Sequence, residues 1–163
     1  MHSRSYRIRY AAFLRSDFPR IPLANNLTLF NLLSRLGSQL VDLHLLESPK
    51  FIENSIEFIG ANNPVIDKPS WSNNIVWLDK TQTSGFKDVT EDVWNFYIGS
   101  YQVCYKWLKD RNGRKLTDED INFYKKIVFA ISETNRLMVE IDNDIEQHGG
   151  WPSAFHNPAG PNL

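Results

Sequence analysis

The chain has 163 residues and a formal net charge of −1, and 42% of its residues are hydrophobic. This length and composition fit a single domain or a domain fragment and exclude an intrinsically disordered chain, while the absence of any apolar run of about eighteen residues excludes a membrane span. The single cysteine, Cys104, argues against a disulfide scaffold and suits a reducing compartment, so we expect a cytoplasmic protein.

The first 49 residues are predicted to form a helical part. Residues 1–20 indicate a short amphipathic helix with Ile8, Ala11 and Ala12 on its apolar face, ended by the prolines near residue 20. A second helix is predicted because leucines recur at helical spacing, and Pro49 closes it. Those leucines are Leu29, Leu33, Leu36, Leu40 and Leu43.

Residues 50–89 are predicted to form a variable part made of strands and loops. The segments "SIEFIG" (55–60) and "NNIVWLD" (73–79) are short apolar runs bounded by Asn, Pro, Ser and Gly. Runs of this kind are typical of short strands between turns. We therefore expect a small antiparallel sheet here.

Residues 90–150 predict a second helical part. Thr90 is a plausible N-cap for a helix over "TEDVWNFYIG" (90–99), because acids follow it in the first turn. Next, Tyr101, Cys104, Tyr105 and Leu108 share one face of a helix that ends at the Asn-Gly pair 112–113.

A long final helix is predicted from Thr117, with Asp120 completing a capping box, to about His148 before two glycines. Its acidic stretch "EIDNDIE" (140–146) lacks the Gly and Glu of a calcium loop and is interpreted as a solvated face. Residues 151–163 form a Pro/Gly-rich tail.

Together these elements predict an α+β, mainly helical fold. We expect a helical bundle with a long C-terminal helix and a small antiparallel sheet from the middle region. Five aromatic residues are expected in its core, because exposed rings at this density are costly. They are Trp94, Phe96, Tyr97, Trp107 and Phe123.

Catalytic and metal-binding patterns are absent from the sequence. It has no Gly-rich phosphate loop, no G-x-G-x-x-G and no G-x-S-x-G. The four histidines are scattered, and Cys104 lies on an apolar helix face that suits a structural thiol. We therefore assign no catalytic residue and no metal ligand.

Positive charge concentrates in two stretches. Residues 1–20 hold five arginines and one aspartate, and residues 101–115 hold five cations and one aspartate. The second set, here called the basic cluster, consists of Lys106, Lys109, Arg111, Arg114 and Lys115. Such clusters suit either a local anion-binding surface or solvated helix faces that never meet in space.

Three segments carry a resemblance to a known family. A pattern V-W-x-F-x-I-G-G-Y is matched at 93–101, a W-L-K-D-R segment at 107–111 and S-E-T-x-R-L-M at 132–138. With further similarity at 9–23 and 40–49, the chain resembles the C-terminal specificity (target recognition) region of Type ISP restriction-modification enzymes, apart from a variable patch around 50–85. Ser100 replaces the family's second glycine, which bears on the geometry of a turn.

The resemblance implies a DNA-binding target recognition module without catalysis of its own. The family joins this region to a nuclease, a helicase-like motor and an N6-adenine DNA methyltransferase. The expected partners are therefore double-stranded DNA and the methyltransferase or helicase portion of the same system. The methyltransferase signature is missing here, so S-adenosylmethionine, ATP and Mg are expected only in other parts of the enzyme. The chain is then a terminal piece: a shortened gene product, a separate subunit or an excised fragment.

Residue roles follow from this resemblance. The basic cluster would contact DNA phosphates, and we expect Arg111 and Arg114 outside the core. Four polar residues would present amide or ammonium groups to bases, although each one taken singly is better explained as a turn-former or a solvated loop residue. They are Asn73, Asn74, Lys80 and Gln82. The alternative is a helical scaffold that docks on a methyltransferase or helicase partner, with the basic cluster incidental.

Overall fold

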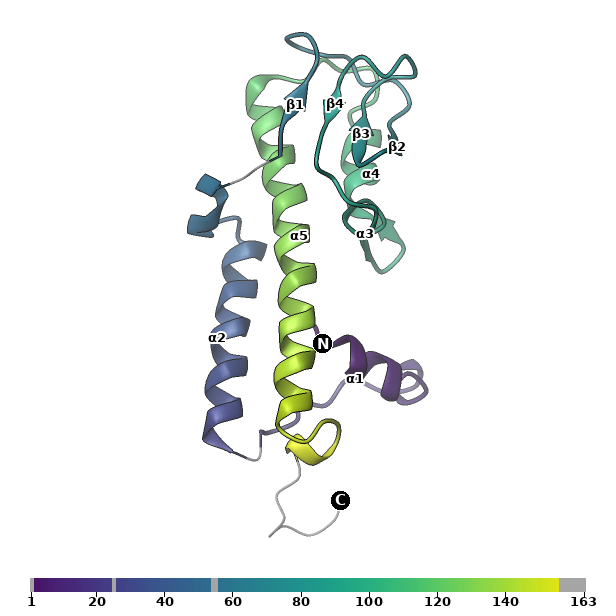
Figure 1. Cartoon of the computed structure of the whole chain (residues 1–163). Coiled ribbons are helices and arrows are strands. Elements are labelled where there is room, and N and C mark those ends of the chain that lie inside the picture. The colour runs from purple at the N-terminus through teal and green to yellow at the C-terminus, as the bar shows by residue number, and fades with distance from the viewer. Residues whose placement is uncertain (1, 25, 54–55, 156–163) are drawn as a thin grey trace. The chain divides into compact units, whose positions relative to one another are not determined.

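The computed structural model describes residues 2–24, 26–53 and 56–155, so most of the predicted tail lies outside the described residues (Figure 1). The chain forms two compact units. Unit 1 comprises residues 1–44 and 134–163, and unit 2 comprises residues 45–133. Helix α5 (Asp118–Gln147) contributes its first half to unit 2 and its last half to unit 1. Within the described ranges, no helix combines the length and apolarity needed to cross a bilayer.

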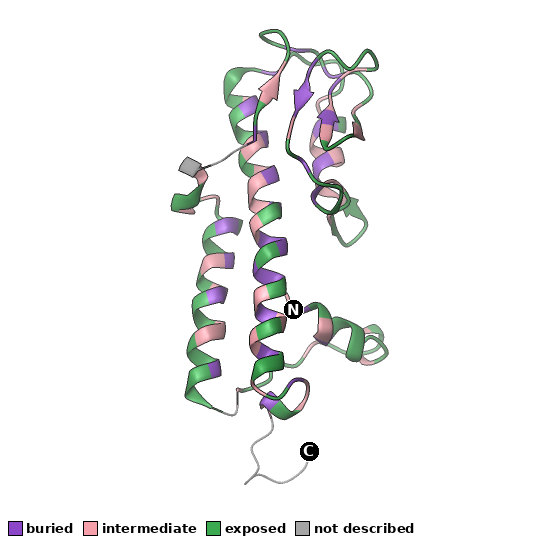
Figure 2. Cartoon of the chain, in the orientation of Figure 1, coloured by how far each residue is buried: buried purple, intermediate pink, exposed green. Residues whose placement is uncertain are grey.

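Unit 1 contains α1 (Arg4–Arg9), η1 (Phe13–Arg15), α2 (Leu27–His44), the last part of α5 and η3 (Ser153–Phe155). The predicted leucine helix is confirmed, and its buried residues lie along one side of α2 (Figure 2). Buried apolar residues of α5 recur at the same helical spacing and belong to the same unit. The two sets are Leu29, Leu36, Leu40 and Leu43, and Leu137, Met138, Ile141 and Ile145.

The predicted apolar face of the first helix is wrong. Helix α1 ends at Arg9, Ile8 is 79% exposed, and the buried residue of the helix is Tyr6. The ring of Tyr6 lies 5.0 Å from the ring of Trp151, which stacks on Phe155 at 4.1 Å. Contacts from distant parts of the chain therefore decide which face of α1 is buried.

The N-terminus of α1 is held by the carboxylate of Asp142 on α5. Its Oδ1 accepts hydrogen bonds from the hydroxyls of Ser3 and Ser5 at 2.5 and 2.8 Å. Its Oδ2 accepts from the backbone N–H groups of Arg4 and Ser5 at 3.0 and 3.1 Å. Asp142 thereby satisfies N–H groups that lack partners within the helix. The interpretation of 140–146 as a solvated face is wrong at this residue.

Unit 2 contains a four-stranded antiparallel sheet in the order β1-β4-β3-β2, which confirms the predicted small sheet. Its strands are β1 (Phe58–Ile59), β2 (Ser70–Ser72), β3 (Ile75–Trp77) and β4 (Gly85–Phe86). Gly85 allows close packing within the sheet, because a Cβ there would lie 2.5 Å from the carbonyl oxygen of Val76. The unit also contains η2 (Pro49–Glu53), the helices α3 (Glu91–Trp94) and α4 (Val103–Lys109), and the first half of α5.

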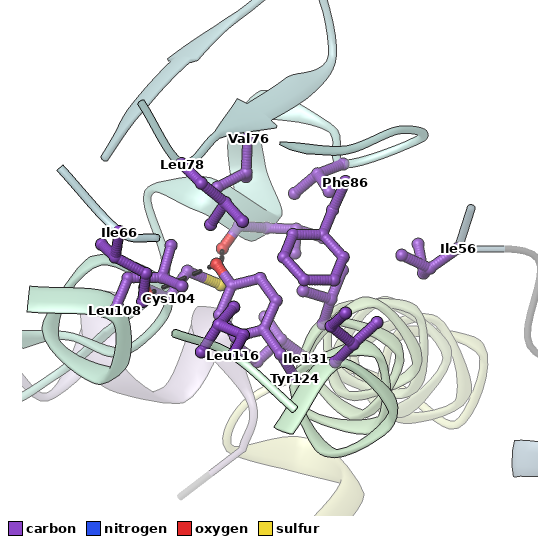
Figure 3. Packing of buried hydrophobic residues seen from close by; sticks show 14 residues of the cluster. Ile56, Ile66, Val76, Leu78, Phe86, Cys104, Leu108, Leu116, Tyr124 and Ile131 are labelled. Carbon is purple, nitrogen blue, oxygen red and sulfur yellow. Dashed lines mark hydrogen bonds between the residues drawn. The ribbon is translucent and has the colours of Figure 1, made fainter. Parts of the chain in front are cut away.

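Tyr124 of α5 lies at the centre of the unit 2 core (Figure 3). It is fully buried, its ring lies 4.6 Å from the ring of Phe86, and its hydroxyl donates to the carbonyl oxygen of Cys104 at 3.4 Å. Burial raises the pKa of Tyr124 above its ordinary value and that of Cys104 to about 12. Cys104 is thus a buried neutral thiol, as the sequence predicts.

The helix predicted over 90–99 is only one turn long. Helix α3 is followed by a hairpin of β5 (Tyr97–Ile98) and β6 (Tyr101–Gln102), and α4 begins after it. Tyr97 is exposed and does not belong to the core. Tyr101 is also exposed, and it lies on strand β6 rather than on a helix face. Phe123 is 44% exposed, whereas Trp94, Phe96 and Trp107 pack against the core as predicted.

The start of α5 confirms the predicted capping box. The backbone N–H of Thr117 donates to Oδ2 of Asp120 at 3.1 Å, and the N–H of Asp120 donates to Oγ1 of Thr117 at 3.2 Å. The helix ends at Gln147, one residue before the predicted end, and both following glycines have positive φ.

We predict that Asp142→Ala destabilises unit 1 in a pH-dependent way. Burial raises the pKa of Asp142, but hydrogen bonds from Ser3, Ser5 and Arg4 outweigh this effect and leave the pKa lowered. Stabilisation by such a carboxylate is present above the unfolded pKa of about 3.9 and is lost as the pH falls through the folded value. Thermal melts should therefore differ by several degrees at pH 7, and the difference should shrink below about pH 4.

The matched control for this prediction is Asp42→Ala, which removes an exposed carboxylate from α2 in the same unit. It should shift the melting temperature little at any pH. Equal shifts in the two variants across the pH range would show that Asp142 contributes only net charge.

Candidate nucleic-acid interface

The basic turn, residues 110–116, connects α4 to α5. Backbone hydrogen bonds hold it to residues 64–66, the segment that precedes β2 in unit 2. The N–H of Gly113 donates to Ile66 O at 2.8 Å, the N–H of Ile66 donates to Arg114 O at 3.2 Å, and the N–H of Leu116 donates to Pro64 O at 2.9 Å. Gly113 has a φ of 77°, which suits glycine. Three cations of the basic cluster are therefore attached to an ordered turn.

Arg111 is more deeply engaged than the sequence predicts. Its guanidinium carbon lies 3.7 Å from the centre of the Trp107 ring, and its Nη1 donates to Trp107 O at 3.2 Å. Its Nε lies 3.9 Å from Oδ1 of Asp120, and the side chain is 28% exposed. Arg111 lies outside the buried core, but its side chain is packed rather than solvated, because the ring of Trp107 provides a surface on which the planar group stacks.

The other four cations of the basic cluster differ in their neighbours. Lys106 forms an ion pair with Asp110 one helical turn away, and Lys109 lies 5.8 Å from the centre of the Tyr105 ring. Arg114 and Lys115 are exposed on the turn, and no ion pair involves them within the described residues. Their charges are the most available to an external anion.

Asn73 and Asn74 form the two-residue turn between β2 and β3. Their φ angles are 53° and 58°, and both side chains are exposed. Positive φ at both central residues is typical of a type I′ hairpin turn, where asparagine is favoured. Turn formation therefore accounts for both residues without any contact to a base.

Lys80 and Gln82 lie on a loop between β3 and β4 that is built around Asp79. Oδ1 of Asp79 accepts from the Thr81 hydroxyl at 2.5 Å and from the Thr83 N–H at 3.2 Å, and its Oδ2 accepts from the Ser84 N–H at 3.0 Å. Burial raises the pKa of Asp79, but these bonds outweigh it and leave the pKa lowered. The loop holds Lys80 and Gln82 exposed on an ordered backbone.

Sheet topology separates the four predicted base-reading residues into two pairs. Successive antiparallel strands reverse direction, so the β2–β3 turn and the β3–β4 loop lie at opposite ends of the sheet. The N–H of Asp67 donates to Leu78 O at 2.8 Å, and Nζ of Lys80 lies 3.5 Å from Oδ2 of Asp67. Residues 64–66, which directly precede Asp67 in the chain, pair with the basic turn.

The structure therefore brings the Asp79 loop and the basic turn to one end of the sheet and leaves the Asn73-Asn74 turn at the other. Sequence reasoning missed Asp79, whose signal is an Asp followed by Thr at the second and fourth positions. It also missed the exposed β5–β6 hairpin. Over the described residues, no group of three or more His, Cys, Asp or Glu side chains is arranged to hold a metal ion.

Comparison with known proteins identifies a matching family and similar solved structures, among them two Type ISP enzymes. A family model described as the Type ISP C-terminal specificity domain matches residues 1–140. A nuclease-deletion mutant of the Type ISP restriction-modification enzyme LlaGI, in complex with a DNA substrate mimic, is 21% identical with a TM-score of 0.59 and covers 85% of this chain. The ATP-dependent Type ISP restriction-modification enzyme LlaBIII, bound to DNA, is 17% identical with a TM-score of 0.60 and covers 86%.

At these identities the two structures show the fold alone, and they agree with the predicted α+β architecture. The chain spans only 12% of the LlaGI chain and 10% of the LlaBIII chain. No curated protein matches the sequence.

We predict that Arg111 and Arg114 differ in their effect on folding. Arg111→Ala should lower the free energy of unfolding by about 1–2 kcal/mol, because it removes the stacking on Trp107 and a hydrogen bond. Arg114→Ala should change it by less than about 0.5 kcal/mol, as is usual for an exposed site. Urea unfolding measures both values, and equal losses in the two variants would contradict the assignment of Arg111 to the packed structure.

Proposed function

Because the chain belongs to the family of Type ISP C-terminal specificity domains, as the sequence resemblance predicts, we propose that it is a DNA-binding target recognition module. Its ligand is double-stranded DNA, and the module contributes specificity to a restriction-modification enzyme whose adenine-specific methyltransferase activity resides in other parts. The observation that carries this proposal is the family match over residues 1–140, combined with an ordered basic turn that presents free cations.

The basic turn suits phosphate contacts for two reasons. Arg114 and Lys115 are exposed and form no ion pair within the described residues, so a phosphate does not have to displace a paired carboxylate. The backbone bonds to residues 64–66 fix the turn before DNA arrives, which lowers the ordering cost of binding. Lys106 and Lys109 add positive charge along α4, whereas Arg111 mainly supports the turn from inside.

Base recognition is assigned to the Asp79 loop in preference to the Asn73-Asn74 turn. Lys80 and Gln82 lie at the same end of the sheet as the basic turn, so a duplex held by Arg114 and Lys115 passes close to them. A lysine can donate to guanine O6 or N7, and a glutamine can pair with adenine N6 and N7. Asn73 and Asn74 keep their role in the hairpin turn.

Catalysis and cofactor binding are assigned to other parts of the enzyme. We propose that this chain binds neither S-adenosylmethionine nor ATP, because its sequence contains no phosphate loop and no methyltransferase signature. Saturable binding of either compound in titration calorimetry would contradict this assignment.

We predict that phosphate contacts of the basic turn appear in the salt dependence of DNA binding. The double variant Arg114→Ala/Lys115→Ala should flatten the slope of log K against log salt by about 0.9 for each phosphate that is no longer neutralised. Affinity should fall about equally on unrelated duplexes, because phosphates carry no base identity. Fluorescence anisotropy on two duplexes over a salt series measures both effects.

The matched control removes two cations that already have carboxylate partners, Arg35 with Glu140 and Lys50 with Glu133. The variant Arg35→Ala/Lys50→Ala changes the net charge by the same amount and should keep the slope nearly unchanged. If the basic-turn variant remains folded and its slope equals that of the parent, the turn makes no phosphate contact.

A second function, docking on a partner protein, is favoured by exposed apolar residues in unit 1. Six large apolar side chains between residues 8 and 30 are each more than half exposed, which is typical of a protein interface when they lie close together. They are Ile8, Phe18, Ile21, Leu23, Leu27 and Phe30. Ile21 also borders an apolar cavity of about 290 Å³ between Leu33, Leu40 and Trp151.

The partner that fits this surface is the remaining part of a Type ISP enzyme, since the chain spans only 12% and 10% of the two related enzymes, which are roughly seven to nine times as long. We predict that Ile21→Ser/Leu23→Ser weakens co-migration with a separately produced methyltransferase and motor portion in size-exclusion chromatography. Thermal stability should change little, because both side chains are solvated. Unchanged co-migration would contradict docking through this surface, and loss of a self-associated form would assign the surface to a second copy of the chain.

A further inference from the structure

The tip of the β5–β6 hairpin presents large apolar side chains to solvent. Tyr97 is 55% exposed, and Ile98 and Tyr101 are each 59% exposed. Among the described residues of unit 2, only Leu45 has a similarly exposed large apolar side chain. Three such residues within five positions form a cluster, whereas single exposed apolar residues are ordinary.

Ile98 and Tyr101 form one apolar pair on this hairpin. They are cross-strand partners, and so are Tyr97 and Gln102. Paired residues of antiparallel strands point to the same face, and neighbouring residues along a strand point to opposite faces. Ile98 and Tyr101 therefore share one face, while Gln102 on the other face donates from Nε2 to Trp94 O at 2.8 Å.

The base of the hairpin is fixed to the core. The N–H of Val103 donates to Phe96 O at 3.1 Å, which continues the pairing beyond the two short strands. Phe96 and Trp94 pack against the buried cluster of unit 2, and the Trp94 ring lies 6.1 Å from that of Tyr105 on α4. The exposed pair is thus carried on an anchored support.

The turn at the tip explains why Ser100 can replace a glycine. Gly99 has a φ of 60°, and Ser100 is not among the residues with positive φ. This pattern is typical of a type II′ turn, which requires glycine only at its first central position. The hairpin geometry therefore tolerates the substitution, and the tip stays narrow.

Charge favours a nucleic acid as the occupant of this tip. Residues 95–105 contain no charged side chain, and β6 leads directly into α4, which carries Lys106 and Lys109 and no acid. At a rise of about 1.5 Å per residue, the two lysines follow the hairpin by about 5 and 9 Å along the helix axis. Of the flanking acids, Asp110 is ion-paired with Lys106, whereas Glu91 and Asp92 lie on α3, before the hairpin. Lys109 forms no ion pair within the described residues, so its charge is the one next to the hairpin that is available to a phosphate.

We propose that Ile98 and Tyr101 enter a groove of the bound duplex and make apolar contact with its bases and sugars, while Lys109 of α4 contacts an adjacent phosphate. DNA-binding proteins use small apolar wedges and aromatic rings in this way. The inference rests on the proposed duplex binding and adds a contact that is not electrostatic. It gives the exposed hairpin a role distinct from that of the basic turn.

The test compares the full chain with the variant Ile98→Thr/Tyr101→Thr. Threonine keeps the strand preference of the hairpin while removing most of its apolar surface, so the fold should persist. Anisotropy should show about a tenfold loss of affinity for a duplex. The slope of log K against log salt should stay unchanged, because an apolar contact releases no counterion. The heat capacity change of binding should become less negative, since less apolar surface is buried.

The matched control is Leu45→Ala/Val139→Ala, which removes two exposed apolar side chains outside the hairpin and should leave affinity unchanged. The single variant Tyr101→Ala provides a milder change if the double variant melts early, and its affinity should still fall several-fold.

The outcomes separate this inference from the proposed function. If the parent chain binds duplexes with a steep salt slope and the hairpin variant binds equally well, the inference is wrong and the proposed function stands. If the parent chain binds no duplex, both are wrong. If the hairpin variant keeps duplex binding but no longer co-migrates with the remaining part of a Type ISP enzyme, the tip contacts protein and the inference is overturned.

Discussion

The short antiparallel pairing between residues 64–66 and 113–116 holds the candidate interface together. Three backbone hydrogen bonds join the basic turn to the segment that leads into β2, and the next residue, Asp67, bonds to the end of β3. These bonds use main-chain groups, so they fix the turn without using the side chains of Arg114 and Lys115. Because Arg111 stacks on Trp107 beneath the turn, the same region is also tied to the aromatic core. The position of the exposed cations Arg114 and Lys115 therefore follows from backbone geometry and from one half-buried stack.

Local patterns in the sequence were sufficient to predict the regular elements. The leucine spacing of α2 and the capping box at Thr117 and Asp120 depend on residues three or four positions apart, and both are found as predicted. The order of these predicted elements gave the α+β fold class, with which the two similar structures agree. Such features survive because neighbouring residues in the chain determine them.

Features that depend on distant contacts could not be predicted in this way. Asp142 looks like one acid among several on a helix, yet its partners Ser3 and Ser5 are more than 130 residues away in the chain. Tyr97 and Tyr101 are large aromatic residues of the kind usually found in a core. In the structure they lie on a hairpin that turns at Gly99, and both are exposed. Lys80 lies at the end of the sheet nearest the basic turn because of the strand order, and the strand order cannot be deduced from composition.

The loop built on Asp79 separates the residues that hold it from the residues it displays. The Asp79 carboxylate accepts hydrogen bonds from the hydroxyl of Thr81, the backbone N–H of Ser84, and the backbone N–H and hydroxyl of Thr83. None of these bonds uses the side chain of Lys80 or Gln82. Substitution of the Lys80 or Gln82 side chain therefore removes none of these bonds, whereas loss of the Asp79 carboxylate removes all of them. A loop of this design can diversify rapidly between related proteins, so that a lineage acquires new surface chemistry at the sheet's end without first rebuilding its scaffold.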